Sequence, residues 1–138
     1  MNTIDEIQRE IIREFALLED PFDQYAYLLK LSSFLPVMDE ETRAACGEVK
    51  GCQSHVWLRS STEDGRFFLE AESDTMLIRG FLYLIRKCVN GQPLADVAHA
   101  DLYFLHDSGL VENLTADRRK GLGYVKAEIL RRAAAYLK

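Results

Sequence analysis

One cysteine has the surroundings expected of a nucleophile. Cys52 follows Gly51 at the end of a polar loop, and a strand-like run begins right after it. Only the thiolate of cysteine is a strong nucleophile, and a free thiol has an ordinary pKa of about 8.5. Gly51 gives a partner close access because it has no side chain, while Gln53 and Ser54 can donate hydrogen bonds to sulfur. This stretch favours sulfur chemistry at Cys52, although a cysteine simply buried at a strand start fits the residues equally well.

The other cysteines and the histidines do not complete a metal or catalytic set. Cys46 lies six residues before Cys52, which is not Cys-x-x-Cys spacing, and a bystander role is favoured over that of a resolving thiol. Cys88 falls in an apolar run and is expected in the core. On an extended chain His55 points to the opposite face from Cys52, which argues against a Cys–His pair. We therefore expect no bound metal, and surface or capping roles for the two remaining histidines, His99 and His106.

Length and charge limit the function classes. The 138 residues fit one domain, which is expected to span residues 1–138. A formal net charge of -5 argues against nucleic acid, whose phosphates require Lys and Arg. The longest apolar run, near residues 76–89, is broken by basic residues and does not fit a membrane span. The first residues lack the basic region and apolar core of a signal peptide, so we expect a cytoplasmic protein with reduced thiols.

Two helices are predicted in the first part of the chain. Thr3 and Glu6 are placed like a capping box, and apolar residues recur at helical spacing over residues 4–18. Asp20-Pro21 has the residue types that cap and open a helix, and Pro36 would end that second helix. Its apolar side is expected to comprise Phe22, Tyr25, Leu28, Leu29 and Ser32.

A β-hairpin is predicted in the middle of the chain. Val56 and Leu58 alternate with Trp57 and Arg59, a pattern that suits a strand. Glu63-Asp64-Gly65 is a hairpin turn signal, and residues 66–71 would return as the second strand. Two strands are marginally stable alone, so we expect a third strand or helices against one face.

Helices are predicted over most of the remaining chain. Asp74 or Thr75 could cap a nearly apolar, buried helix over residues 76–89. Thr115 is placed to cap the last helix. Its apolar stripe is expected to comprise Leu122, Val125, Ile129, Ala133 and Leu137. The element order predicts an α+β fold in which helices pack on one side of a small antiparallel sheet.

Three motifs follow one another along the chain. They are Gly51-Cys52-Gln53-Ser54-x-Val56-Trp57, then Ser73-Asp74 before an apolar helix, and then Leu114-Thr115-x-x-Arg118-x-x-Gly121-Leu122. In this order they resemble the SufE/CsdE family of sulfur acceptors, and the resemblance spans most of the chain. It implies an α+β fold related to that of the iron–sulfur scaffold protein IscU. The chain departs from the family pattern at Gly47, where Asn is usual, at His55, where Gln is common, and at Cys46.

The resemblance implies a persulfide carrier rather than a stand-alone enzyme. A PLP-dependent cysteine desulfurase of the SufS/CsdA type would pass sulfur to Cys52 and be stimulated by this protein. The sulfur would then go to an iron–sulfur scaffold complex of the SufBCD type. The family's sulfur-accepting cysteine falls on Cys52, and Asp74 and Arg118 match the later motifs. Residues with partner-binding or loop-supporting roles would be Gly51, Gln53, Ser54, Asp74 and Arg118.

The resemblance also bears on cofactors, assembly and alternatives. PLP resides in the partner, so no cofactor is expected on this chain, which would be a monomer or weak homodimer. One alternative is a non-catalytic adaptor of a desulfurase, in which Cys52 is merely packed. Another is an iron–sulfur scaffold, which is disfavoured because the three cysteines lack a matched ligand set.

Overall fold

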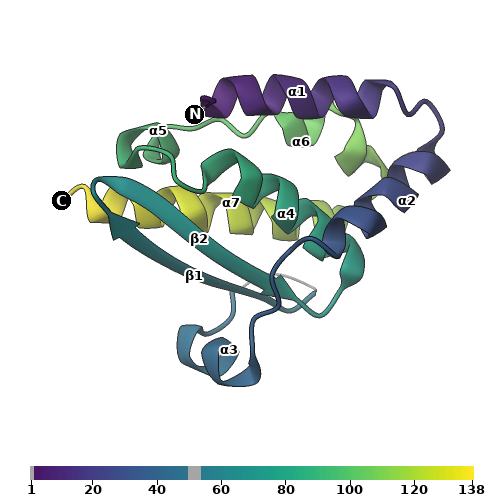
Figure 1. Ribbon diagram of the computed structural model, residues 1–138. Helices are drawn as coiled ribbons and strands as arrows, with labels where there is room; N and C mark the ends of the chain where they lie inside the picture. Colours follow the sequence, from purple (N-terminus) through teal and green to yellow (C-terminus); the bar gives the residue numbers. More distant parts are fainter. Residues whose placement is uncertain (1, 50–53) are drawn as a thin grey trace.

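A computed structural model of the chain describes residues 2–49 and 54–138, and it has the predicted α+β architecture (Figure 1). A single antiparallel hairpin is the only sheet among these residues. The elements are α1 (Ile4–Ala16), α2 (Pro21–Ser32), α3 (Glu40–Cys46), β1 (Val56–Glu63), β2 (Arg66–Ser73), α4 (Met76–Val89), α5 (Leu94–Ala98), α6 (Phe104–Asp107), the 3-10 helix η1 (Leu110–Asn113) and α7 (Ala116–Tyr136). In Figure 1, α4 and α7 lie on one side of the hairpin, and α3 lies on the other.

The hairpin is set by its turn. Asp64 and Gly65 both have positive φ, 52° and 75°, as a two-residue turn that matches the strand twist requires. From there the strands pair in full register, from Glu63 opposite Arg66 to Val56 opposite Ser73. The open end of the hairpin therefore lies eight residue pairs from the turn.

Both outer edges of the hairpin are partly covered. Along β2, the Phe67 amide donates to the Gln92 carbonyl at 2.8 Å, and the Leu69 amide donates to the Asn90 side chain at 2.9 Å. Along β1, the guanidinium of Arg132 in α7 donates to the Leu58 carbonyl at 2.9 Å. The connection between α4 and α5 and the side chain of Arg132 thus supply partners that a third strand would otherwise provide.

The core lies between the hairpin and the helices. Apolar side chains of β1 and β2 pack against α4 and α7. The largest buried side chains of this core include Leu58, Phe67 and Leu69 of the hairpin, and Phe81 and Phe104 of the helices. Helices α2 and α4 cross closely at Gly80, where an added Cβ would lie 2.4 Å from the Leu28 carbonyl oxygen. Only glycine fits this crossing.

Two predicted helix boundaries were wrong. Helix α1 ends at Ala16, two residues before the predicted end. Helix α2 ends at Ser32, well before Pro36, because Arg79 of α4 donates to the carbonyls of Ser32 and Leu35 and draws the chain out of the helix. The predicted caps Thr3, Asp20 and Thr115 do accept hydrogen bonds from the first turns of their helices.

Three side chains that belong to the predicted apolar faces are exposed. Phe22 is 74% exposed and Tyr25 47%, because α2 packs on α4 through its C-terminal half, at Leu28 and Leu31. Leu137 is 50% exposed because it lies past the end of α7, beyond the last buried position of the stripe.

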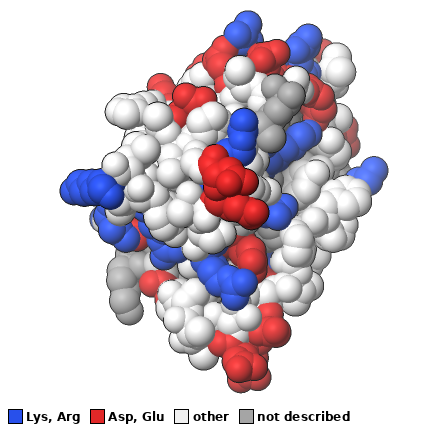
Figure 2. All heavy atoms as spheres, turned by 60° about the vertical axis from the view of Figure 1, so that its left-hand side comes forward, with Lys and Arg blue, Asp and Glu red and all other residues white. Residues whose placement is uncertain are grey.

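The surface charges bear on nucleic acid binding, and the lengths of the helices bear on membrane spanning. On the face shown in Figure 2, Lys and Arg are interspersed with Asp and Glu and do not form the basic field that nucleic acid binding requires. Within the described part of the chain, no helix combines the length and the apolar character needed to cross a bilayer.

Candidate functional site

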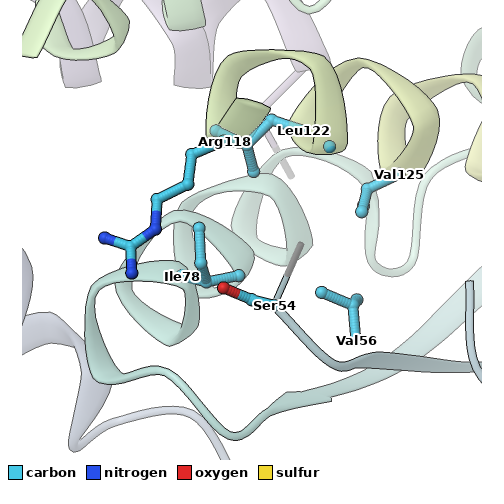
Figure 3. A pocket seen from close by; sticks show the side chains of 7 residues that line it. Ser54, Val56, Ile78, Arg118, Leu122 and Val125 are labelled. Atoms are coloured by element: carbon cyan, nitrogen blue, oxygen red, sulfur yellow. The ribbon is translucent and has the colours of Figure 1, made fainter. Parts of the chain in front are cut away.

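A small pocket begins where the described chain resumes at Ser54 (Figure 3). The space between its lining atoms is about 220 Å³, which includes the part that opens to solvent. Arg118 and Ile78 lie at one end of the view, Val56 and Val125 at the other, and Ser54 between them. The lining residues come from the start of β1, from α4 and from α7, and are Ser54, Val56, Ile78, Arg118, Gly121, Leu122 and Val125. The pocket is therefore mostly apolar, with one hydroxyl and one guanidinium.

The start of α7 places Arg118 at the pocket. The Arg118 amide donates to the Thr115 hydroxyl at 3.2 Å, so the residue lies in the first turn of the helix. A cation there is unfavourable beside the positive end of the helix dipole. Among the described residues, no carboxylate lies within ion-pair distance of the Arg118 side chain. The Arg118 guanidinium is therefore free to attract an anion at the pocket, as far as the described residues go.

The chain that leaves the pocket is fastened to the end of β2. The His55 amide donates to the Asp74 carboxylate at 3.1 Å, and the Asp74 amide donates to the His55 carbonyl at 3.3 Å. The Thr75 hydroxyl donates to that of Ser54 at 3.0 Å. The prediction that Asp74 could cap α4 is therefore wrong. Thr75 is the N-cap residue but makes no side-chain capping bond. The side chains of Asp74 and Thr75 bond to residues 54–55 instead.

The chain that enters this region is fastened to β1. The Val49 amide donates to the Val56 carbonyl at 2.8 Å, and Glu48 pairs with Trp57 as an isolated bridge. The Glu48 carboxylate also accepts from the His55 ring at 2.7 Å. Residues 49 and 56 are thus neighbours, and residues 50–55 span between them.

His55 is the titrating group of this junction. The hydrogen bond and charge of Glu48, and then the charge of Asp74, raise the pKa of the His55 imidazole above its ordinary value. The protonated ring therefore favours the folded junction at pH values below the unfolded pKa, about 6.5. That contribution is lost as pH rises through the folded pKa.

Replacing Glu48 by Gln should move the His55 pKa back toward its ordinary value, because the main cause of the shift is removed. An NMR titration of the ring protons measures this. Asp74→Asn should lower the pKa less, because its charge is the smaller cause. An unchanged pKa in Glu48→Gln would show that the ion pair does not form in solution.

The predicted site residues divide into two groups. Gly51, Cys52 and Gln53 lie outside the described residues. Ser54 and Arg118 line one pocket, and Asp74 bonds to the residue that follows Ser54.

The other two cysteines lie apart from this pocket. Cys46 is half-buried, with its sulfur 3.8 Å from that of Met38. Cys88 is fully buried in α4, and burial raises the pKa of its thiol to about 12, which makes it unreactive. Within the ranges 2–49 and 54–138, no three metal-ligating side chains gather closely enough to hold an ion.

Sequence reasoning missed Glu48 and Thr75 as partners of residues 54–55. A carboxylate and a histidine seven residues apart carry no local signal, because only the pairing of Val49 with Val56 brings them together. The position of Thr75 before a helix predicts only a cap, which is the usual role of a threonine there.

Comparisons with known proteins agree on one family. The family model described as SufE: Fe-S metabolism associated domain matches residues 9–133. An uncharacterized SufE-like protein of Rhizobium etli is 35% identical over 118 residues, covering 82% of this chain and 80% of that protein. The sulfur acceptor protein CsdE of Escherichia coli K12 is 30% identical over 118 residues, covering 84% and 80%. The solution structure of a hypothetical protein from Thermus thermophilus shares the fold, with a TM-score of 0.78, 19% identity and coverage of 95% and 96%.

Proposed function

Since the chain belongs to the SufE family, a domain of Fe-S metabolism, we propose that it is a sulfur acceptor that carries a persulfide on Cys52. The donor is a PLP-dependent cysteine desulfurase of the SufS/CsdA type, which the protein stimulates. The recipient is an iron–sulfur scaffold complex of the SufBCD type. The name of the E. coli relative, a sulfur acceptor protein, supports this role. PLP belongs to the desulfurase in this scheme, and this chain needs no cofactor of its own.

The reaction is a thiol–persulfide exchange. The Cys52 thiolate attacks the outer sulfur of the desulfurase persulfide, forming a new S–S bond. The S–S bond within the donor breaks, and its electron pair leaves on the inner sulfur as a thiolate. Cys52 then carries the outer sulfur as a persulfide, with no net oxidation or reduction. A second thiolate, on the recipient, takes that sulfur by the same exchange.

The observation that carries the proposal is the unpaired Arg118 beside Ser54 in an otherwise apolar pocket of the described chain. Cys52 lies two residues before Ser54 in the sequence. A nearby cation favours the thiolate over the thiol, and Ser54 can donate a hydrogen bond to an anionic sulfur. Apolar walls would shield a bound sulfur from water-borne thiols and oxidants, which attack exposed persulfides.

The test is mass spectrometry of the protein after incubation with a desulfurase and cysteine. One added sulfur atom, about 32 Da, on the peptide that contains Cys52 supports carriage. Full stimulation of the desulfurase without any added sulfur would show a non-catalytic adaptor instead. A coloured cluster on anaerobic reconstitution with iron and sulfide would show a scaffold.

Arg118→Gln should slow sulfur uptake about threefold at neutral pH. Loss of the cation raises the pKa of the Cys52 thiol and lowers the thiolate fraction, while greater nucleophilicity offsets part of that loss. Alkylation rates of Cys52 measured against pH locate the shift. Arg119→Gln is the matched control, because Arg119 is the next residue of α7 and does not line the pocket. Equal pH profiles for the two variants would remove Arg118 from the proposed mechanism.

A further inference from the structure

A buried ion pair lies where β2 turns into α4. The Glu72 side chain is 4% exposed and that of Arg79 is 15% exposed, and one Arg79 nitrogen donates to Glu72 Oε1. Burying two charges costs free energy that an ion pair rarely exceeds, so a buried pair is weak evidence of a purely stabilising role. Its other contacts show what it holds in place.

The pair joins three parts of the chain. The amide of Met38 donates to Glu72 Oε2 at 3.0 Å. Arg79 donates to the carbonyls of Ser32 and Leu35, at 3.2 and 2.7 Å. Both members of the ion pair therefore bond to the backbone around the segment between α2 and α3. These are charge-assisted bonds, the stronger kind of hydrogen bond.

That segment leads directly to the candidate site. Met38 precedes Asp39, whose carboxylate caps α3 by accepting from the Thr42 amide at 2.7 Å. Helix α3 ends at Cys46, and Glu48 and Val49 follow. The Cys46 sulfur also contacts that of Met38, so the end of this short helix returns to the residue that Glu72 holds.

The end of β2 thus fixes both approaches to residues 50–53. Glu72 holds the segment before α3 through Met38. Two and three residues later, Asp74 and Thr75 hold residues 54–55. The two anchors are only two to three residues apart, at the point where β2 passes into α4, so the short stretch of backbone between them sets their separation.

We propose that Glu72, with Arg79, is a positioning residue for sulfur acceptance, placing α3 and the Glu48–Val49 segment relative to the Ser54–Arg118 pocket. This inference rests on the proposed function. Small misplacements of a reacting group lower rates strongly, by up to about a hundredfold per ångström. Loss of the Glu72 anchor should therefore change the reaction rate even where the core stays folded.

The experiment compares Glu72→Gln with Glu70→Gln. Glu70 lies on the same strand, pairs with the exposed Arg59 at 3.2 Å, and is the matched control. Amide hydrogen exchange and the single-turnover rate of sulfur loading on Cys52, at saturating desulfurase, are measured at a temperature where both variants are folded by circular dichroism. Glu72→Gln should speed exchange at Met38 and in α3, leave α7 unchanged, and slow loading on the order of tenfold. Glu70→Gln should do neither.

The outcomes separate this inference from the proposed function. Faster exchange at Met38 with wild-type loading would overturn the positioning role and leave sulfur carriage standing. Unchanged exchange at Met38 would overturn the anchor itself. A wild-type protein that never loads sulfur would refute the proposed function, and this inference with it. If Glu72→Gln does not fold, Glu72→Asp keeps the charge but shortens the reach, and it should show the same changes in smaller measure.

Discussion

Cys52→Ser is expected to abolish sulfur loading and stimulation of the desulfurase, while the unfolding transition stays that of the wild type. A serine hydroxyl is not ionised near neutral pH and forms no persulfide, so no residual transfer through residue 52 is expected. Incubation with desulfurase and sulfur-labelled cysteine, followed by measurement of protein-bound label, gives the result directly.

Two further cysteine variants serve as controls for this experiment. Cys46→Ser should still load sulfur, because Cys46 is expected to be a bystander. Cys88→Ala should also load, because the buried Cys88 thiol, with a pKa of about 12, takes no part in exchange. Undiminished labelling of Cys52→Ser would contradict the central proposal and direct attention to Cys46.

Gly80→Ala is expected to destabilise the protein by about 1–3 kcal/mol, the usual cost of overpacking. The added methyl would lie 2.4 Å from the Leu28 carbonyl oxygen, which is backbone within α2 and cannot rotate aside. Helices α2 and α4 must then separate. Urea unfolding followed by circular dichroism measures the change in the free energy of unfolding.

The control substitution is expected to change the stability in the opposite direction. Gly123→Ala, on the exposed side of α7, meets no atom within 4 Å and should stabilise the protein by about 0.5–1 kcal/mol through helix propensity. Equal effects of the two substitutions would show that α2 and α4 do not cross closely at Gly80 in solution.

Elements with local signals could be predicted from the sequence. The capping box at Thr3 and Glu6 and the Asp64-Gly65 turn each depend on residues a few positions apart, and both are present. The end of α2 could not be predicted, because it is set by Arg79, 47 positions after Ser32. The sequence favours a capping role for Asp74 for the same reason, since its actual partner, the His55 amide, is 19 positions away.

The candidate site could be predicted in part. The motifs singled out Ser54, Asp74 and Arg118 individually, but their residue types do not show that Ser54 and Arg118 line one pocket. That arrangement depends on α7 packing beside β1, a contact between distant parts of the chain. The role of Glu72 carries no local signal either, because the Met38 amide that it holds lies 34 positions earlier in the chain.

The partly covered edges of the hairpin have a consequence for solubility. A two-stranded sheet with open edges would invite pairing with other chains, the first step of aggregation. Here residues 90–92 bond to one edge, and Arg132 donates a hydrogen bond to the Leu58 carbonyl on the other. The remaining length of β1 ends in Ser60, Ser61, Thr62 and Glu63, whose polar side chains are poor templates for amyloid-like stacking. The hairpin can thus remain two strands wide in a crowded cell without growing into a larger sheet.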